Sequence, residues 1–320
     1  MNYQENKIIE VSIYKPEHKS LWDDFVSLSK NGVFLFYRDY MEYHSDRFQD
    51  HSLLFFHDGR LIGLLPANLR GDTLYSHEGL TFGSVISNSE MQLSTMLQIF
   101  EELVKYCKEK NIRRIFYKSI PYMYHSIPAD EDLYALFRNG ATIIARSPCS
   151  AISLSEKVER SRERNKAIRK AKNNSLVVKR SYDLKSFMKL VEDVLLERHG
   201  AKPVHSSQEM ELLMKRFPDN IKLFTTHQGE TMLAGCLVYE SKNVAHAQYG
   251  FNSNVGLHLG ALDLVYDYLI SDYGKTKKYF DFGTSTENLG QVLNFGLARN
   301  KEGFGARAVI HDFYQLTINE

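Results

Sequence analysis

Short apolar runs separated by turn residues open the chain, and stretches with helical spacing follow them. Apolar residues at 52–56 and 61–65 flank His57-Asp58-Gly59-Arg60, and an Asp-Gly pair between two apolar runs predicts a tight hairpin. Between residues 90 and 110 the apolar positions recur at i, i+3, i+4 and i+7, which predicts a long amphipathic helix with a capping box at Ser89 and Gln92. The other predicted elements are a strand at 113–118, a helix at 131–138 and strands at 141–145 and 151–154.

The second half of the chain repeats this order of elements. A helix that joins two strands of one sheet makes a crossover, and such crossovers are typical of α/β units with mixed sheets. We therefore predict a duplicated α/β fold with tandem domains at 1–154 and 155–320, each a central mixed sheet flanked by helices. The predicted elements of the second half are strands at 221–226, 232–239 and 244–249, helices at 186–197, 208–216 and 261–273, and a further strand over 277–281.

Composition adds a charge asymmetry between the halves. The 320 residues are 43% apolar and 25% charged with a net charge of +1, so the whole chain gives no reason to expect a protein that binds nucleic acid, DNA included, or a membrane. Residues 1–150 hold 16 basic and 19 acidic side chains, whereas residues 151–320 hold 24 and 20. The run from Lys157 to Arg180 is rich in Lys and Arg. It is either a solvated linker helix or a platform for an anionic ligand.

Several classes of protein are excluded at this stage. Cys107, Cys149 and Cys236 lie far apart in apolar stretches, so we expect buried free thiols, without a disulfide framework or a metal site. The first residues contain no signal region, and no apolar run approaches the ~18 residues of a membrane span. We therefore expect a cytoplasmic protein.

The C-terminal region carries a family resemblance. Tyr279–Ser285, Asn294–Leu297 and Lys301–Ala306 resemble the FemAB-like branch of the GNAT acyltransferase superfamily, whose members carry two GNAT domains in tandem. Arg164–Ala171 is similar to the basic run that opens the second domain in this branch. The resemblance implies acyl transfer to an amine, either from a coenzyme A thioester or from an aminoacyl-tRNA in building peptidoglycan cross-bridges. It implies no metal.

Coenzyme A-dependent GNAT enzymes hold the pyrophosphate on a glycine-rich loop at the start of their long helix. Residues 254–261 have two glycines and a helix start at this place, although the spacing differs from the family pattern. The corresponding Ser87–Glu90 has no glycine, so we expect the donor site in the second half. Arg299 occupies the position of the usual tyrosine acid. The residues expected at the donor are Gly256, His258, Gly260, Ala261 and Arg299.

Three residues are candidates for the chemistry. Strand alternation places His246 and Gln248 on one face, and in the GNAT arrangement this strand borders the cleft where donor and acceptor meet. A histidine can remove the proton of an ammonium. Lys301 is expected to stabilise charge on the donor, and Asp281 either binds the acceptor amine or caps the turn after it. The alternatives are a structural histidine on the sheet and a solvated lysine at a helix end.

The substrate is expected to contact Gln248, Arg164 and Arg169. Our leading hypothesis is an acyltransferase that moves an acyl group from acetyl-CoA or another acyl-CoA to an amine of a small or cell-envelope-related acceptor. Acyl-CoA is favoured because the glycines remain at the helix start, while residues 198–207 contain no coiled-coil arm. The alternatives are aminoacyl-tRNA-dependent, FemAB-type transfer to a peptidoglycan precursor, and a degenerate, non-catalytic GNAT pair that binds an anion.

Overall fold

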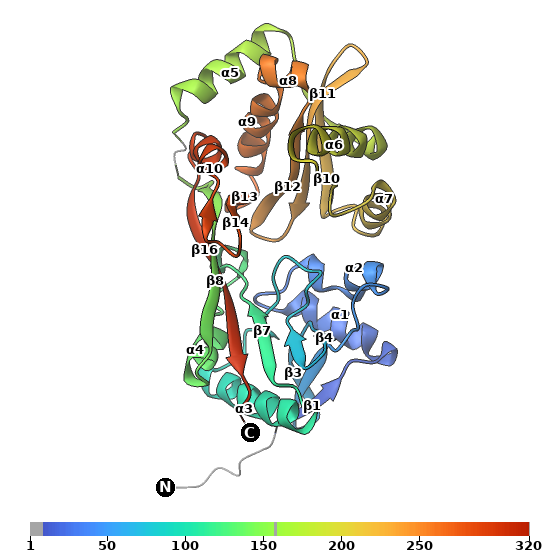
Figure 1. Cartoon of the computed structure of the whole chain (residues 1–320), viewed down its shortest axis with the longest axis vertical. Coiled ribbons are helices and arrows are strands. Elements are labelled where there is room, and N and C mark those ends of the chain that lie inside the picture. Colours follow the sequence, from blue (N-terminus) through green and yellow to red (C-terminus); the bar gives the residue numbers. More distant parts are fainter. Residues whose placement is uncertain (1–8, 157–158, 320) are drawn as a thin grey trace. The chain divides into compact units, whose positions relative to one another are not determined.

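The computed structural model describes residues 9–156 and 159–319, and the chain divides into two compact units (Figure 1). Unit 1 contains residues 1–147, 289–291 and 310–320, and unit 2 contains residues 148–288 and 292–309. Residues 1–8, part of the N-terminal stretch in which no signal region is expected, and Lys157 of the basic run lie outside the described residues. β8 (Thr142–Ser153) and β16 (Arg307–Thr317) contribute residues to both units.

Unit 1 combines two groups of strands with helices. β1-β2-β3-β6 form one sheet, and β4-β5-β7-β16 are neighbours in that order in another. The strands are β1 (Ile9–Ile13), β2 (Leu53–His57), β3 (Arg60–Leu65), β4 (Asn68–Arg70), β5 (Thr73–Tyr75), β6 (Ile86–Ser87) and β7 (Arg114–Lys118), and the helices are α1 (Lys19–Leu28), α2 (Arg38–Met41), α3 (Leu93–Glu109) and α4 (Glu131–Arg138).

Unit 2 is built on a sheet with the strand order β8-β13-β12-β11-β10-β9. Its strands are β9 (Val178–Ser181), β10 (Ile221–Gln228), β11 (Thr231–Glu240), β12 (Val244–Asn252) and β13 (Tyr279–Thr284), with a small β14 (Thr286–Glu287) and β15 (Val292–Leu293) pair. Its helices are α5 (Arg162–Asn173), α6 (Leu184–His199), α7 (Ser207–Arg216), α8 (Asn254–Leu259), α9 (Ala261–Tyr273) and α10 (Phe295–Glu302).

The predicted α/β class is confirmed, and both crossovers are present. β5 pairs parallel with β7, and β12 pairs parallel with β13, whereas the hairpins β2–β3, β10–β11 and β11–β12 are antiparallel. α3 lies between the first two strands in the chain, and α9 lies between the second two. Each parallel pair therefore has the long connecting helix that its geometry requires. The boundary between residues 154 and 155 was placed where the predicted order of elements begins to repeat, and it stays a prediction.

The hairpin at residues 53–65 is confirmed, whereas the capping box before α3 is wrong. Asp58 and Gly59 both have positive φ, as a two-residue hairpin turn of this type needs. α3 begins at Leu93, and its N-cap residue Gln92 makes no side-chain capping bond. The Asn88 Oδ1 instead accepts a hydrogen bond from Glu90 N, so a local turn organises the residues that we had assigned to the cap.

The strands predicted at 141–145 and 151–154 form the single long strand β8.

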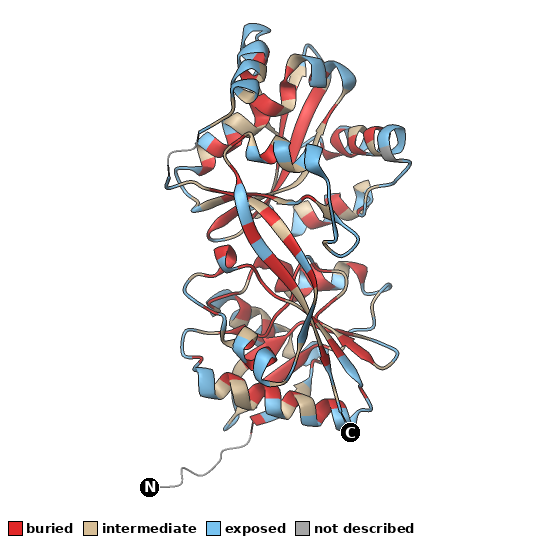
Figure 2. Ribbon diagram, turned by 60° about the vertical axis from the view of Figure 1, so that its left-hand side comes forward, coloured by how far each residue is buried: buried red, intermediate tan, exposed pale blue. Residues whose placement is uncertain are grey.

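Buried residues concentrate on the strands and on the inward faces of the helices (Figure 2). In unit 2, α9 and α5 cover the sheet face that carries Cys236 and Val238. α6 covers the opposite face, where a Cβ at Gly235 would lie 2.8 Å from the Phe187 ring.

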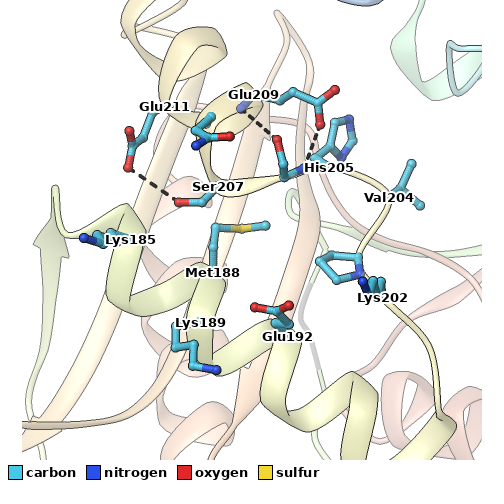
Figure 3. Close-up of a pocket in the computed structure, with 13 residues that line it drawn as sticks. Lys185, Met188, Lys189, Glu192, Lys202, Val204, His205, Ser207, Glu209 and Glu211 are labelled. Carbon is cyan, nitrogen blue, oxygen red and sulfur yellow. Dashed lines mark hydrogen bonds between the residues drawn. The ribbon is translucent and has the colours of Figure 1, made fainter. Parts of the chain in front are cut away.

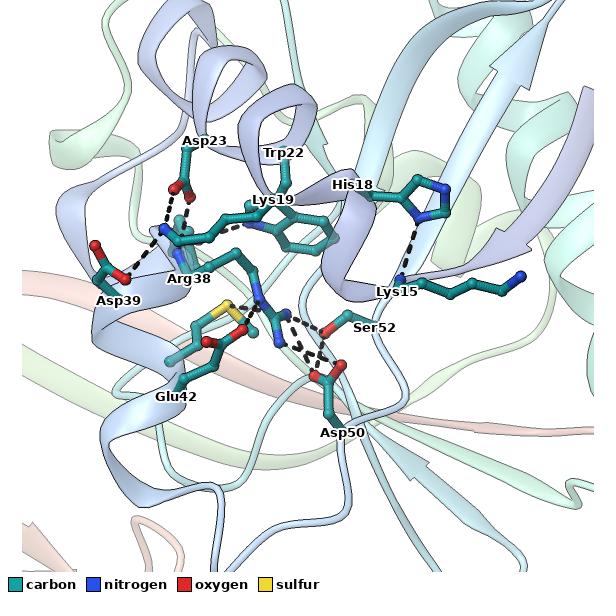
Figure 4. A network of polar contacts seen from close by, with 12 residues as sticks. Lys15, His18, Lys19, Trp22, Asp23, Arg38, Asp39, Glu42, Asp50 and Ser52 are labelled. Atoms are coloured by element: carbon teal, nitrogen blue, oxygen red, sulfur yellow. Dashed lines mark hydrogen bonds and ion pairs between the residues drawn. The ribbon is translucent and has the colours of Figure 1, made fainter.

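A buried arginine organises the beginning of unit 1 (Figure 4). Arg38 is 2% exposed and lies with its guanidinium 3.7 Å from the centre of the Tyr14 ring. Its Nε donates to Glu42 at 3.0 Å, and its Nη2 lies 3.3 Å from an Asp50 carboxylate oxygen. A buried cation with this many partners is stable only as a complete network. We therefore regard this network as structural.

Candidate functional site

The strands β12 and β13 run parallel for a short distance and then separate. Their ladder has three pairs, and the last of them joins His246 to Asp281. β12 continues to Asn252 and β13 to Thr284, and no pair in the described chain joins the two strands beyond that point. The backbone groups of β12 after His246 therefore have no strand partner on this side, and such an edge can pair with an extended ligand.

A β-bulge lies where the strands separate. Val238 pairs with Ala247 but Leu237 pairs with Tyr249, so Gln248 is the extra residue. One inserted residue moves all later side chains to the other face. Our alternation for this strand is therefore wrong after Ala247, because Tyr249 continues the face of His246. The Tyr249 hydroxyl lies 2.7 Å from His205 Nδ1, and burial raises the pKa of Tyr249 to about 12.

His246 and Asp281 form a hydrogen-bonded pair. His246 Nδ1 lies 2.9 Å from Asp281 Oδ2, and the aspartate is 2% exposed. The other carboxylate oxygen accepts a hydrogen bond of 2.7 Å from Gly283 N, so Asp281 also holds the backbone turn at Gly283 near the end of β13. With Nδ1 bound to the carboxylate, the ring has Nε2 available for a substrate proton.

Gly283 is a residue that the sequence analysis missed. Its φ is +70°, and a Cβ at this position would lie 3.2 Å from His246 Cε1. A side chain would therefore be strained by the backbone and would also press on the imidazole. The signal in the sequence is that Gly283 comes two residues after Asp281, the last residue of the predicted strand, where the chain is expected to turn.

Lys301 from α10 reaches the end of β13. It is 7% exposed, and its Nζ donates hydrogen bonds of 3.1 Å to the Gly283 carbonyl and 2.6 Å to the Thr284 carbonyl. Loss of solvation lowers the pKa of Lys301 to about 8, although the nearby Asp281 opposes this shift. Cys149 pairs with Thr284 from β8, and burial raises the pKa of its thiol. The structure thus brings His246, Asp281 and Lys301 together, as a site of proton transfer and charge stabilisation would require.

The chain is similar in sequence and in fold to known proteins. The sequence profile described as acetyltransferase (GNAT) domain matches residues 157–289. A search of curated proteins gave no match. The crystal structure of FemX is similar with a TM-score of 0.66 at 13% identity, covering 95% of this chain and 96% of that chain. The chain has the GNAT fold of FemX-type proteins.

Two further structures share the GNAT fold along nearly their whole length. L-PGS from Bacillus licheniformis has a TM-score of 0.57 at 12% identity, covering 99% of this chain and 95% of that chain. A tandem GNAT protein from the clavulanic acid biosynthesis pathway has a TM-score of 0.52 at 12% identity, covering 98% and 99%. At these identities the likeness concerns the fold alone.

In this GNAT fold the amides of the expected donor site have partners within the chain. Ser253 caps α8, and its Oγ accepts from Gly256 N at 3.0 Å while its carbonyl accepts from Leu257 N at 2.8 Å. Asn252 Oδ1 accepts from Leu262 N at 2.9 Å in the first turn of α9. These amides would have to release their present partners before they could hold a pyrophosphate.

The two glycines of this segment are needed for packing. A Cβ at Gly256 would lie 2.2 Å from the Leu233 carbonyl of β11, and a Cβ at Gly260 would lie 2.5 Å from the Ala167 carbonyl of α5. Gly260 has a φ of +73° and joins α8 to α9. Ala261 is buried, and His258 is exposed in the last turn of α8. The backbone of α5 therefore lies against the turn where we expected the donor phosphates.

The predicted arginines lie on α5 and α10 and not beside His246. Arg164 donates a 2.6 Å hydrogen bond to Asp263 of α9, which ties α5 to that helix. Arg299 is exposed and lies 3.5 Å from Glu163. Arg169 is an exposed residue of α5.

A cavity of about 720 Å³ lies between α6, α7 and the segment that joins them (Figure 3). Met188 and Glu192 of α6 line it, together with His205 and Ser207. His205 connects this side of unit 2 to Tyr249 and hence to the face of β12 that carries His246.

The described residues offer no metal site and no membrane span. Over 9–156 and 159–319, no group of three His, Cys, Asp or Glu side chains is arranged to hold a metal ion. In the same part of the chain, no helix is both long enough and apolar enough to cross a bilayer.

Proposed function

We propose that unit 2 transfers an acyl group to an amine and that His246 is the general base. The observation that carries this proposal is the His246–Asp281 hydrogen bond at the point where β12 and β13 separate. Asp281 is a positioning residue that fixes the imidazole tautomer and stabilises the imidazolium.

The reaction proceeds by direct attack. His246 Nε2 removes a proton from the acceptor ammonium, and the free amine attacks the acyl carbonyl to form the C–N bond. The tetrahedral oxyanion collapses, the bond from the acyl carbon to its carrier breaks, and the imidazolium gives its proton to the leaving oxygen or sulfur. The attacking nitrogen releases its second proton to solvent, so the products are a neutral amide, the free carrier and one proton. The Lys301 ammonium holds the end of β13 and contributes a positive field at the oxyanion.

The proposed donor is an aminoacyl-tRNA. This reverses our preference for acyl-CoA, because Ser253 and Asn252 occupy the amides at the helix start and α5 lies against Gly260. Similarity in fold to FemX and to L-PGS from Bacillus licheniformis supports an aminoacyl group. The acceptor would be an amine of a cell-envelope precursor, entering from the side of α6 and α7.

Acyl-CoA remains the second candidate donor. The observation in its favour is the similar fold of the tandem GNAT protein from the clavulanic acid biosynthesis pathway, a structure described as being without AcCoA. A degenerate pair that binds an anion without turnover is the non-catalytic alternative.

Transfer assays with each donor test the proposal. Purified protein is mixed with an amine acceptor library and either charged tRNA or acetyl-CoA, and labelled product is measured. We expect product from charged tRNA, and we expect His246→Gln to lower its rate by roughly 100-fold to 10,000-fold. Lys215→Gln, an exposed change on α7, is the matched control. Undiminished transfer by His246→Gln would exclude our base, and turnover with acetyl-CoA alone would exclude our donor.

A further inference from the structure

A basic groove runs beside α5, where this helix packs against α9 in unit 2. It encloses about 570 Å³ and is lined by Arg160, Arg162, Asn165, Ile168, Arg169, Lys172 and Asp267. Four of these side chains are cationic and one is anionic, so the groove carries an excess of three positive charges. Such a concentration of like charge in one concave site is unfavourable without a compensating anion.

The cations of the groove fall into two groups. Arg160 and Lys172 are held in place by Asp267, at 2.9 Å and 3.0 Å. The Nε of Arg160 is buried and has no hydrogen-bond partner in the described chain. Arg162 and Arg169 are exposed on α5, and neither forms an ion pair or a side-chain hydrogen bond within the described part of the chain. Two fixed cations and two unpaired ones thus line the same cavity.

We propose that this groove is a phosphate-binding site that holds the anionic carrier of the acyl donor; this rests on the proposed function. Guanidinium groups match phosphate oxygens in charge and geometry, and a phosphate would supply the missing acceptor for Arg160. The phosphates therefore bind to side chains of α5, while the amides of the glycine turn keep their partners within the chain.

The experiment measures binding of deacylated tRNA and, separately, of coenzyme A to the full chain over a range of salt concentrations. The test variant is Arg162→Gln/Arg169→Gln. Neither arginine has a recorded partner that its loss would leave unpaired. The control is Lys166→Gln/Lys170→Gln, which removes the same charge from exposed positions of α5 outside the groove.

We expect the groove variant to weaken tRNA binding at least 10-fold and to make the slope of log K against log salt shallower by about 2, because each lost phosphate contact removes about one unit. The control should change affinity less than threefold. If the groove variant weakens binding of coenzyme A but not of tRNA, the phosphate site is supported and its ligand is coenzyme A. Equal losses in the two double variants, or no loss in either, would overturn the site.

The binding readout separates this inference from the proposed function. Groove-dependent binding without transfer to any amine would support the site and contradict the enzyme. If the groove variant transfers the acyl group with an unchanged KM for the donor, the phosphate site is contradicted while the proposed acyltransferase function is still supported.

Discussion

At the scale of single residues, the candidate site depends on how a few atoms are held. Asp281 uses one carboxylate oxygen for His246 and the other for the Gly283 amide, and Lys301 holds the carbonyls of the same turn. The turn therefore fixes both partners of the proton-transfer pair. Small displacements of reacting groups cost large factors in rate, so the turn itself can be tested.

Gly283→Ala should lower kcat more than it lowers stability. An alanine at positive φ costs about 1–2 kcal/mol, and here its methyl group would also press on the His246 ring, so we expect a loss of roughly 100-fold in kcat. Gly229→Ala is the matched control, because Gly229 has a φ of +57° but would have no atom within 4 Å of its Cβ. Unfolding by urea and steady-state rates are measured for both. Equal rates in the two variants would refute the packing argument.

The ionisation of Lys301 should limit the rate at high pH. Its pKa is lowered to about 8, so the ammonium is lost as pH rises through that value and transfer should slow. Between pH 8 and about 10.5 the native state binds fewer protons at this group than the unfolded state does, so the free energy of unfolding rises with pH in this range. Slower transfer there would therefore not result from unfolding. Lys301→Arg, which stays charged, should remove this limb from the pH–rate profile. An unchanged limb would contradict a role for this ammonium.

At the scale of elements, the sequence predicted helices and strands better than their junctions. The helix at 261–273 and the strand at 113–118 follow from apolar periodicity, and the structure confirms both within one residue. The bulge at Gln248 could not be predicted, because a bulge inserts one residue into a strand without altering the apolar pattern of the sequence. Gly256 and Gly260 stay predicted donor residues, although glycine gives the same sequence signal at a phosphate loop and at a close backbone contact, and both positions pack closely against a neighbouring carbonyl.

The contact between α5 and the α8–α9 turn should be sensitive to one methyl group. Gly260→Ala would place a Cβ 2.5 Å from the Ala167 carbonyl, whereas Gly200→Ala has the same backbone strain with no neighbour. We expect Gly260→Ala to cost about 1–3 kcal/mol more in the free energy of unfolding, as overpacked sites do. Chemical denaturation of both variants measures this difference. Equal unfolding free energies would mean that α5 does not depend on this contact.

At the scale of the whole molecule, the α/β class and the GNAT fold could be predicted, and the chemistry only in part. The fold could be predicted from the order of helices and strands and from the motifs that follow Tyr279. His246, Asp281 and Lys301 could be selected singly, but their contacts could not. The parallel pairing of β12 and β13 joins His246 to Asp281 across 35 positions, and α10 brings Lys301 back to Gly283 across 18 positions. The basic run was visible in the sequence, whereas its division into ion-paired and unpaired residues needed the packing of α5 on α9.

The most direct test of the central claim is a double-mutant cycle on the transfer rate with His246→Gln, Asp281→Asn and the double variant. If the aspartate acts through the histidine, the double variant should be no slower than His246→Gln alone, because residues that act as one unit do not give additive losses. Asp281→Asn alone should reduce kcat while leaving KM for the acceptor nearly unchanged. Losses that multiply in the double variant, or an Asp281→Asn enzyme with full activity, would contradict the account.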